Sequence, residues 1–536
     1  MSGSVKKFKE HHQGQAVLLP QDIDSLIPEN DIVRVVNSVI NEVDISSLLS
    51  KYKGGGTTSY HPRMMLKVLI YSYLQGNYSC RRIAKSLREN IYYMWLSGKS
   101  TPSYKTINNF RSGRLKREIE QVFASLVDFC ITENYIDLNE LYVDGTKMEA
   151  DANKHTAIWR KNTHRYKDGV AQKVRAILKE VDQINKDDDD KYGDNDLPER
   201  GEHLNTEELK RKMEQLSDQI NTKAEKSIKR ELSKKRTQLK NEIKKLAKYE
   251  QQEEILAGRN SYSKTDPDAT FMRWKDERLL PTYNVQASTQ HQFVIHYTID
   301  QNANDQRAFE NHLNQLPERF RPKSYVGDSG YGSQINYERL NELGIDNYLK
   351  YPFFHREIST RTKDPFGKSA FNYDLDTDSY TCPENRSLTL YQTTTKKLRN
   401  GKSTKIRIYK CENCTGCRHF TNCVKSGPSR RITIAVRWEE LKTIAKQNLT
   451  SDQGIVYRKR RSIDVETLFG NIKRNKRYKR FRLRGMEKVK IEFGLLAMAQ
   501  NIAKMAAKTA EKSLFDIISN ILSWSKGVHC LNRKYC

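Results

Sequence analysis

The chain has 536 residues, a length that favours about three domains, or two with large insertions. Lys and Arg total 94 against 66 Asp and Glu, and this formal charge of +28 indicates a polyanionic partner, nucleic acid ahead of an acidic membrane face. The 28 Tyr and 17 Phe exclude disorder throughout, and no apolar run nears the roughly 18 residues of a membrane span. No apolar segment follows the first lysines, so we expect no secretory signal and a reducing, cytoplasmic compartment.

Apolar residues at helical spacing predict helices over 31–51 and 62–74, the second with Pro62 in its first turn. Residues 79–117 predict two or three short helices, and residues 81–117 contain ten Lys or Arg and one acid. Basic helices around a tight turn are compatible with a DNA-binding helix-turn-helix. A plain helical bundle with a solvated face explains the pattern equally well.

A strand over 141–145 ends at a carboxylate, Asp144. An acidic, turn-rich linker follows at 187–196, and residues 206–256 show a repeat of three and four residues among dense Lys and Glu. We expect a helical hairpin or coiled-coil arm there, inserted into a larger domain.

The pattern then predicts a hairpin, a helix, a strand ending at a second carboxylate (Asp328), a further helix and a further strand. Their ranges are 282–299, 305–316, 324–332, 333–343 and 347–350, and residues 436–525 again have helical spacing.

Asp144 and Asp328 terminate strands in unrelated segments, and a third acid, Glu466, lies in a predicted helix. If they converge, they form an oxygen-rich site for two Mg²⁺ or Mn²⁺ ions, which can activate a water or a 3′-hydroxyl against a phosphodiester. Residues 456–490 contain 14 Lys or Arg and three acids. Gly145, Gly327, Gly330 and Gly332 are expected to leave room for a backbone or phosphate to approach. The alternative is that acids at strand ends merely form turns.

Five cysteines cluster in the second half of the chain, four of them within 13 residues. Short Cys-x2-Cys spacing favours a structural zinc site, with His419 as an alternative ligand. An iron–sulfur cluster or free thiols are the other interpretations. The candidate zinc ligands are Cys382, Cys411, Cys414, Cys417 and Cys423.

A basic stripe with interleaved aromatics directly follows Glu466 and indicates phosphate contacts, with a solvated helix face as the alternative. Its candidate DNA-binding residues are Lys473, Arg474, Arg477, Arg480, Arg482 and Arg484.

The segment from Asp144 to Ala150 resembles the first-aspartate region of DDE transposases from bacterial insertion sequences. More narrowly, it resembles the IS-eleven-eighty-two-like subgroup of the IS-four/IS-five-like superfamily. Further matching segments extend the resemblance from about residue 61 to 506, and they are ordered along the chain. They are Asn153-Lys154, Trp159-Arg160-Lys161, Thr265 to Ala269, Tyr283 to Gln286, Gly327 to Tyr331, the Glu466 helix, Phe481 to Gly485 and Asn501.

The resemblance implies a mixed α/β fold with a ribonuclease H-like core, a helical N-terminal DNA-binding region, and Asp144, Asp328 and Glu466 as catalytic metal ligands. It adds Trp159, Tyr457 and Arg461 as candidate DNA contacts. Related families carry Tyr-x2-Arg-x3-Glu-x6-Lys. Glu466 and Lys473 fit that spacing, but the arginine position is Ser462.

An alternative alignment anchored on Tyr457 and Arg460 would make Asp464 the acid and Asn471 the lysine position. We prefer Glu466, because its lysine and its helical apolar neighbours agree.

We therefore expect a transposase that binds element ends, hydrolyses phosphodiester bonds and joins 3′-hydroxyls to target DNA, acting as a homodimer at the bacterial nucleoid, with no membrane contact. A zinc-containing DNA-binding regulator and a two-metal endonuclease without strand transfer are the alternatives. The expected domains are 1–130 (helical, DNA-binding), 138–165, 271–352 and 433–515 (catalytic core), 166–270 (linker and arm), 353–432 (cysteine-rich) and 516–536 (tail).

Overall fold

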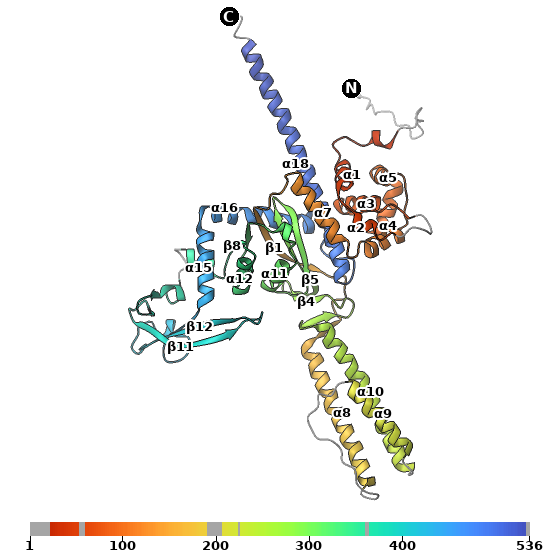
Figure 1. Ribbon diagram of the computed structural model, residues 1–536, viewed down its shortest axis with the longest axis vertical. Helices are drawn as coiled ribbons and strands as arrows, with labels where there is room; N and C mark the ends of the chain where they lie inside the picture. Colours follow the sequence, from red (N-terminus) through yellow and green to blue (C-terminus); the bar gives the residue numbers. More distant parts are fainter. Residues whose placement is uncertain (1–21, 53–58, 190–205, 223–225, 360–363, 532–536) are drawn as a thin grey trace, which may run out of the picture. The chain divides into compact units, whose positions relative to one another are not determined.

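The computed structural model describes residues 22–52, 59–189, 206–222, 226–359 and 364–531 (Figure 1). The chain forms two compact units, one of Met1–Tyr135 with Phe493–Cys536 and one of Ile136–Glu492. The expected domain boundaries stay a proposal. No helix in the described ranges combines the length and the apolar character that a membrane span requires.

The first unit is helical. Asp31 caps its first helix by accepting a hydrogen bond from the Val33 amide at 2.8 Å, and Pro62 begins α3 as predicted. The predicted helix over 31–51 is two helices, because the backbone is extended at Val43. The elements are η1 (Ile23–Leu26), α1 (Ile32–Glu42), α2 (Ser46–Leu49), α3 (Pro62–Leu74), α4 (Cys80–Glu89), α5 (Ile91–Ser97), α6 (Tyr104–Asn109), η2 (Phe110–Arg114), α7 (Ile119–Thr132) and, from Phe493 on, α18 (Met486–Leu531).

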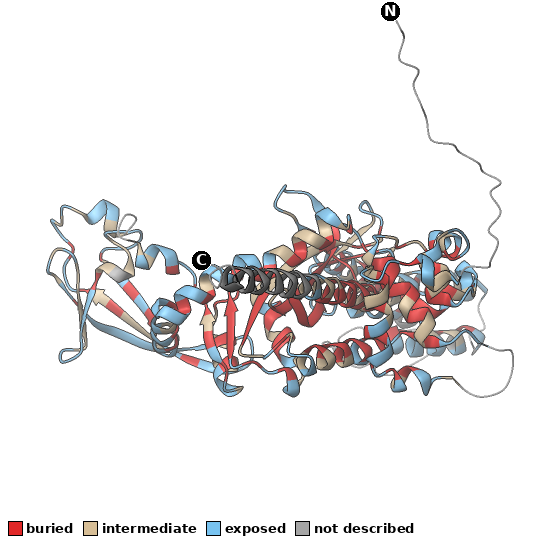
Figure 2. Cartoon of the chain, turned by 90° about the horizontal axis from the view of Figure 1, so that it is seen from above, coloured by how far each residue is buried: buried red, intermediate tan, exposed pale blue. Residues whose placement is uncertain are grey.

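The second unit is built on a mixed sheet in which β5 pairs with β4, β6 and β1, followed by β7 and β8. β1 runs antiparallel to β5 and parallel to β7, and β7 runs parallel to β8. The sheet is buried, including every residue of β5 after Leu279 (Figure 2). Its strands are β1 (Glu140–Glu149), β4 (Thr270–Arg273), β5 (Leu279–Gln290), β6 (Phe293–Asp300), β7 (Ser324–Gly327) and β8 (Asp346–Leu349).

Helical elements cover both faces of this sheet. The alternation of β5 side chains shows this, because Ser288 bonds to His312 of α11 while its neighbour Thr289 bonds to Asp464 of η5. This is a mixed α/β fold, as predicted. The elements that accompany the sheet are α11 (Asp305–Asn314), η3 (Glu318–Phe320), α12 (Gln334–Glu342), α15 (Val436–Thr450), α16 (Asp452–Arg461), η5 (Ser462–Glu466), α17 (Thr467–Gly470) and η6 (Asn471–Asn475).

A helical arm leaves the sheet domain through the short antiparallel pair β2 (Ala157–Trp159) and β3 (Ser261–Ser263). It contains α8 (Arg160–Asp189), α9 (Thr206–Thr222) and α10 (Lys226–Leu256), with α10 packed on both of the others (Figure 1). The predicted arm over 206–256 is therefore helical, and α8 joins it. The linker predicted at 187–196 lies mostly outside the described residues.

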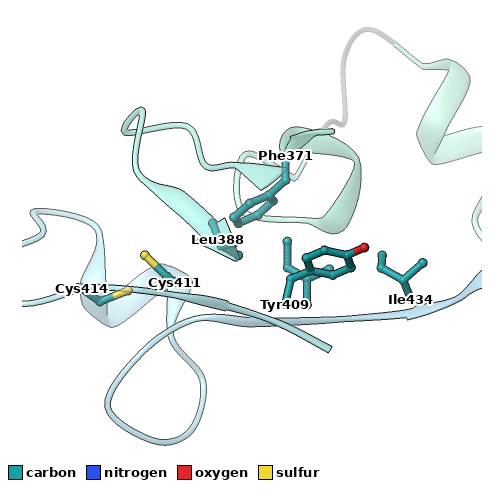
Figure 3. Packing of buried hydrophobic residues seen from close by; sticks show 7 residues of the cluster. Phe371, Leu388, Tyr409, Cys411, Cys414 and Ile434 are labelled. Atoms are coloured by element: carbon teal, nitrogen blue, oxygen red, sulfur yellow. The ribbon is translucent and has the colours of Figure 1, made fainter. Parts of the chain in front are cut away.

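The cysteines belong to a second, five-stranded antiparallel sheet in the order β13-β12-β11-β10-β9. Phe371, Leu388, Tyr409, Ile432 and Ile434 form its core with two of the cysteines (Figure 3). The elements are α13 (Phe354–Ile358), η4 (Lys368–Ala370), β9 (Asn372–Asp374), β10 (Ser379–Thr381), β11 (Ser387–Lys397), β12 (Ser403–Cys411), α14 (Phe420–Cys423) and β13 (Arg431–Ala435).

Candidate functional site

Asp144 lies within β1, between β5 and β7. The prediction that the strand ends at this residue was wrong, because β1 stays paired with β5 as far as Glu149. Tyr142, two residues before Asp144 and therefore on the same face, makes an edge-to-face contact with Tyr457 of α16 at 6.3 Å between ring centroids. Asp144 thus points to the face of the sheet that α16 and η5 cover. Its placement follows from the buried apolar residues of β1, Leu141, Val143 and Met148, which fix the register.

Asp328 follows β7, the parallel neighbour of β1, and so lies beside Asp144 at the same end of the sheet. Its Oδ1 accepts a hydrogen bond from the Gly330 amide at 2.8 Å, which turns the chain directly after the strand. The next turn passes close to β8: a Cβ at Gly332 would lie 2.5 Å from the Lys350 carbonyl oxygen. A side chain larger than hydrogen would displace this loop.

Glu466 ends η5, a π-helical turn that continues α16. In a π turn, residues five apart share a face, whereas in an α-helix residues four apart do. Arg461 and Glu466 are five residues apart, one more than in an α-helical turn. The π turn accommodates this extra residue, so that both side chains point to the sheet. The shifted spacing that departs from the related families has this physical explanation.

One guanidinium contacts all three carboxylates. Arg461 Nη2 lies 3.2 Å from Asp144 Oδ1 and 3.7 Å from Asp328 Oδ2, and its Nη1 lies 3.4 Å from Glu466 Oε1. The three acids, remote along the chain, hence converge around a single side chain that is 11% exposed. Three negative charges and one positive charge leave the site with an attraction for further cations.

A hollow of about 720 Å³ opens over these carboxylates, and cations and an aromatic ring form part of its wall. Lys473 donates from Nζ to the Lys147 carbonyl at 2.8 Å and lies over the Trp274 ring, 5.6 Å from its centroid. The lining residues are Asp144, Gly145, Thr146, Lys147, Trp274, Lys275, Asp276, Asn284, Asp305, Asp328, Arg461, Glu466, Phe469 and Lys473.

A fourth acid, Asp305, reaches this hollow from the start of α11. Its Oδ1 accepts hydrogen bonds from Asn284 at 2.9 Å and from Gln286 at 3.1 Å, and the Gln286 side chain in turn accepts from the Tyr331 hydroxyl at 2.8 Å. Sequence reasoning missed Asp305, because no spacing relates it to the other acids. The available signal was the pair Asn284 and Gln286, whose polar side chains alternate with Tyr283 and Val285 along β5 and are themselves buried.

Burial governs the ionisation of the site. It raises the pKa of Asp144 to about 6, although Arg461 opposes the shift. Burial also lowers the pKa of Lys473 to about 8, against the attraction of Asp144. Both side chains therefore titrate close to neutral pH, which is common for groups that bind or exchange ions.

Four clustered carboxylates are suited to bind divalent metal ions, since their oxygen atoms are the ligands that hard cations prefer. Within the described ranges, however, no three His, Cys, Asp or Glu side chains are arranged so as to hold a metal ion. The Arg461 guanidinium lies between the acids instead. The donor set fits Mg²⁺ or Mn²⁺ in kind, and metal ligation stays a prediction.

The alternative acid, Asp464, has a different environment. It is buried, and its Oδ1 accepts from the Thr289 hydroxyl at 2.6 Å and from the Gln292 amide at 3.1 Å. It does not line the hollow. The geometry therefore places Glu466, and not Asp464, with the two aspartates.

The predicted room beside Gly145 is occupied. A Cβ on this residue would lie 2.3 Å from the Gln286 side-chain nitrogen, so the glycine admits Gln286 and not a phosphate. For Gly145 that expectation was wrong, because a long polar side chain from the neighbouring strand crosses the position. At Gly332 a backbone does approach closely, as expected.

The basic stripe divides into residues at the hollow and residues tied to the end of β1. Arg480 lies 3.2 Å from Asp151, and Arg484 contacts the same carboxylate at 2.9 Å. Of the rest, Lys473 lines the hollow, while Arg474, Arg477 and Arg482 are exposed. DNA contact by the stripe stays a prediction.

The two aromatic residues predicted to contact DNA are Tyr457, which is buried, and Trp159, which lies at the base of the arm. Tyr457 is 8% exposed and packs against Tyr142 and Tyr348, an environment that does not support a DNA contact. Trp159, on β2, packs against Phe271 with 5.9 Å between ring centroids. A DNA contact by either ring stays untested.

All five predicted cysteines gather around a cavity of about 20 Å³ that His419 also lines. Figure 3 shows Cys411 and Cys414 beside Leu388 at one end of the buried cluster. Burial and the neighbouring Cys414 thiol raise the pKa of Cys411 to about 12, so the metal-free thiol is protonated at neutral pH. Soft sulfur donors fit zinc by chemistry, and zinc binding stays a prediction.

Two family models match this chain. The model described as transposase DDE domain matches residues 381–506, which include Glu466 and the cysteines but neither aspartate. The model described as transposase domain (DUF772) matches residues 21–113, and together the two cover less than half of the chain. No curated protein and no solved structure matches. The two matches support a transposase of the DDE type, a class that uses divalent metal ions and acts on DNA.

Proposed function

We propose that this chain is a DNA transposase of the DDE type that binds insertion-element ends, hydrolyses phosphodiester bonds there and joins the 3′-hydroxyl ends to target DNA. The observation that carries this proposal is the convergence of Asp144, Asp328 and Glu466 on Arg461 in one hollow. The two family matches support it independently. The insertion-sequence subgroup named above remains part of the proposal.

In this proposal Asp144, Asp328 and Glu466 hold two Mg²⁺ or Mn²⁺ ions, which when bound supply a Lewis acid and an activated oxygen nucleophile. Arg461 keeps the carboxylates together before metal enters, because its charge offsets their repulsion. Asp305 completes the acidic wall and is held by Asn284.

DNA would enter over the same hollow. Lys147 and Lys473 supply positive charge at its wall, and Trp274 offers an aromatic face beside Lys473. The exposed stripe residues Arg474 and Arg477 extend this charge toward the flanking phosphates. The mixed sheet, with its first acid on β1 and its second after the parallel β7, supports a ribonuclease H-like core.

The cysteine-rich sheet would carry one structural Zn²⁺. Its small apolar core of a few side chains supports this, because a bound metal substitutes for a larger core. We expect about one zinc per purified chain, measured by elemental analysis. Cys411→Ser should lose the metal, and Cys130→Ser, a buried cysteine of the other unit, should keep it. Equal zinc in both variants would exclude this site.

The experiment uses labelled duplexes that carry the element ends, with Mg²⁺ and a target plasmid. Asp144→Asn, Asp328→Asn and Glu466→Gln should each reduce cleavage by at least roughly 10³-fold while DNA affinity is retained. DNA binding without cleavage by the unaltered protein would favour a zinc-containing regulator. Cleavage without joined product would favour an endonuclease. Either result contradicts the proposal.

The remaining parts of the proposal are a homodimer, element ends and target as DNA partners, and a place in the bacterial cytoplasm at the nucleoid. The helical first unit would read the element ends, since α4, which packs against α5 and α6, carries four basic residues: Arg81, Arg82, Lys85 and Arg88. The sedimentation of the purified chain with and without element-end DNA tests the dimer.

A further inference from the structure

The cysteine-rich sheet carries more positive charge than its own structure uses. Residues 372–435, which span the sheet, contain 12 Lys or Arg and five acids, Asp374, Asp376, Asp378, Glu384 and Glu412. Some of the cations have internal roles; Arg386, for example, donates to the Asn413 carbonyl. Six form no ion pair with any described residue: Lys396, Lys397, Lys405, Lys410, Lys425 and Arg431. Such an excess indicates a polyanionic ligand.

Two of these cations are held side by side on the outer face of the sheet. A bulge in β11 between Leu390 and Gln392 projects Tyr391, which is 54% exposed. The Lys410 ammonium and the Arg431 guanidinium each lie 5.2 Å from the centre of its ring, and their residues are direct partners across β12 and β13. Cation–π contact fixes both charges at one place.

Arg431 also lines a hollow of about 200 Å³ whose described lining contains no acid. Ser429 lies in this wall at 6% exposure, and its hydroxyl has no hydrogen-bond partner among the described residues. A buried hydroxyl without a partner is unfavourable unless a ligand or water satisfies it. The lining residues are Val424, Lys425, Ser426, Gly427, Ser429, Arg430 and Arg431.

The loop that forms this hollow is held at its end by the cysteine site. Arg430 donates from its amide to Cys414 Sγ at 3.3 Å, and from its guanidinium to the carbonyls of Cys423 and Phe366 at 2.9 Å each. The neighbouring Ser429 and Arg431 are therefore positioned before a ligand arrives, which lowers the entropic cost of binding.

We propose that Lys425, Ser429 and Arg431, with Lys410 beside them, bind a phosphodiester group of the DNA backbone. Two cations and a hydroxyl donor without a carboxylate suit an oxyanion and not a metal or an apolar group. None of these residues lines the carboxylate hollow, so this is a second DNA contact. It rests on the proposed function, since its ligand is DNA.

The test measures the affinity of the full chain for a duplex of arbitrary sequence over a range of salt concentrations. The double variant Lys410→Gln with Arg431→Gln should bind roughly tenfold more weakly at physiological salt. The slope of the logarithm of its binding constant against the logarithm of the salt concentration should be shallower by about 0.9 for each lost phosphate contact. Ser429→Ala should lose affinity a few-fold with an unchanged slope, because it removes no charge.

The matched control removes two exposed charges from the arm, Lys240→Gln with Lys244→Gln, and should leave both affinity and slope unchanged. Equal losses in the control and the test variant would overturn the inference, since total charge would then explain them. A phosphate site could also serve free phosphate instead of DNA. Titration with inorganic phosphate at constant ionic strength, followed by calorimetry, tests this alternative. Phosphate binding that depends on Arg431 together with unaltered DNA affinity would also overturn it.

The two proposals fail in different ways. If the unaltered chain does not bind DNA at all, the proposed function fails. If it binds DNA and the Lys410, Ser429 and Arg431 variants bind equally well, only this second contact fails.

Discussion

At the scale of single residues, Arg461 explains how three carboxylates stay together without a metal. Its guanidinium lies within 3.7 Å of Asp144, Asp328 and Glu466. Without it, like charges this close would repel one another and separate. Burial still raises the pKa of Asp144. The site therefore favours binding of a proton or a cation to this carboxylate over leaving it as an unpaired negative charge.

Asp464 provides the discriminating variant at this scale. Asp464→Ala should lower the free energy of unfolding by about 3 kcal/mol, because the Thr289 hydroxyl and the Gln292 amide lose their acceptor. Cleavage per folded molecule should stay within about threefold of the unaltered protein, unlike Glu466→Gln. Urea unfolding and cleavage assays check this pair. A loss of cleavage in Asp464→Ala equal to that in Glu466→Gln would restore the alternative alignment.

A buried histidine pair makes stability depend on pH. His312 bonds to Ser288 at 2.7 Å and to Thr298 at 2.9 Å, and His296 contacts the His312 carbonyl at 3.1 Å. Burial lowers the pKa of His296 to about 4 and that of His312 well below its usual 6.5. Between about pH 6.5 and 4 the unfolded chain therefore binds protons that the folded chain does not.

Acidification through this window should thus destabilise the fold, by roughly 1.4 kcal/mol per pH unit for each neutral histidine. Asp144, whose pKa is raised, opposes the trend. The comparison of the unaltered protein with His296→Gln isolates the histidine contribution. Urea unfolding at pH 7 and pH 5 should show a smaller loss in the variant, and identical losses would contradict the assignment.

At the scale of elements, the π turn η5 decides which acid reaches the site. Helical periodicity in the sequence places Val465, Leu468 and Ile472 on one buried face, and the structure confirms their burial. The same reasoning left the role of Arg461 open, because a π turn changes the residue spacing without a recognisable sequence signal. An alignment to the fixed Arg-x3-Glu spacing therefore puts Ser462 at the arginine position, although the Glu-x6-Lys spacing still selects Glu466.

The element-scale prediction concerns the extra residue of that turn. Ile463 is 62% exposed, so its deletion should convert the π turn to an α turn and keep Arg461 and Glu466 on one face. Cleavage should remain within roughly tenfold. Insertion of one alanine after Ile463 should instead rotate Glu466 off the site and abolish cleavage. If the deletion is as inactive as the insertion, the π turn has a role of its own.

The elements also show where sequence reasoning works. The hairpin of β5 and β6, the helix from Pro62 and the strand before Asp328 follow from alternation and turn residues, and all are present. Helix α8 was missed, because its buried positions Val170, Val174 and Val181 are sparse among charged residues. Its apolar stripe becomes recognisable only beside α10, on which it packs.

At the scale of the whole molecule, two insertions separate the three acids along the chain, one between Asp144 and Asp328 and one between Asp328 and Glu466. Sequence order hides their convergence, since Asp144 and Glu466 are separated by the arm and by the cysteine-rich sheet. The convergence was an expectation from strand ends and a family resemblance. The contacts that join these acids, through Arg461 and around Asp305, depend on tertiary packing and could not be read from the sequence.

The arm should be dispensable for the carboxylate site. Its helices have buried clusters of their own, and Arg160 at its start donates to the Asn260 carbonyl at its end at 2.9 Å. Replacement of residues 161–259 by Asn-Gly should join β2 to β3 as a tight hairpin, with Arg160 and Asn260 flanking the two-residue turn. The shortened protein should remain soluble and bind Mn²⁺ within about twofold of the full chain, measured by calorimetry. Loss of Mn²⁺ binding would show that the arm supports the site.

The measurement that tests the central claim most directly is Mn²⁺ binding followed by electron paramagnetic resonance. Asp144→Asn, Asp328→Asn and Glu466→Gln should each weaken Mn²⁺ binding at least roughly tenfold, while Asp464→Asn should leave it unchanged. Such a result requires that the three carboxylates share their ions. If any one of the three variants binds Mn²⁺ as the unaltered protein does, the acids do not form a single cation site.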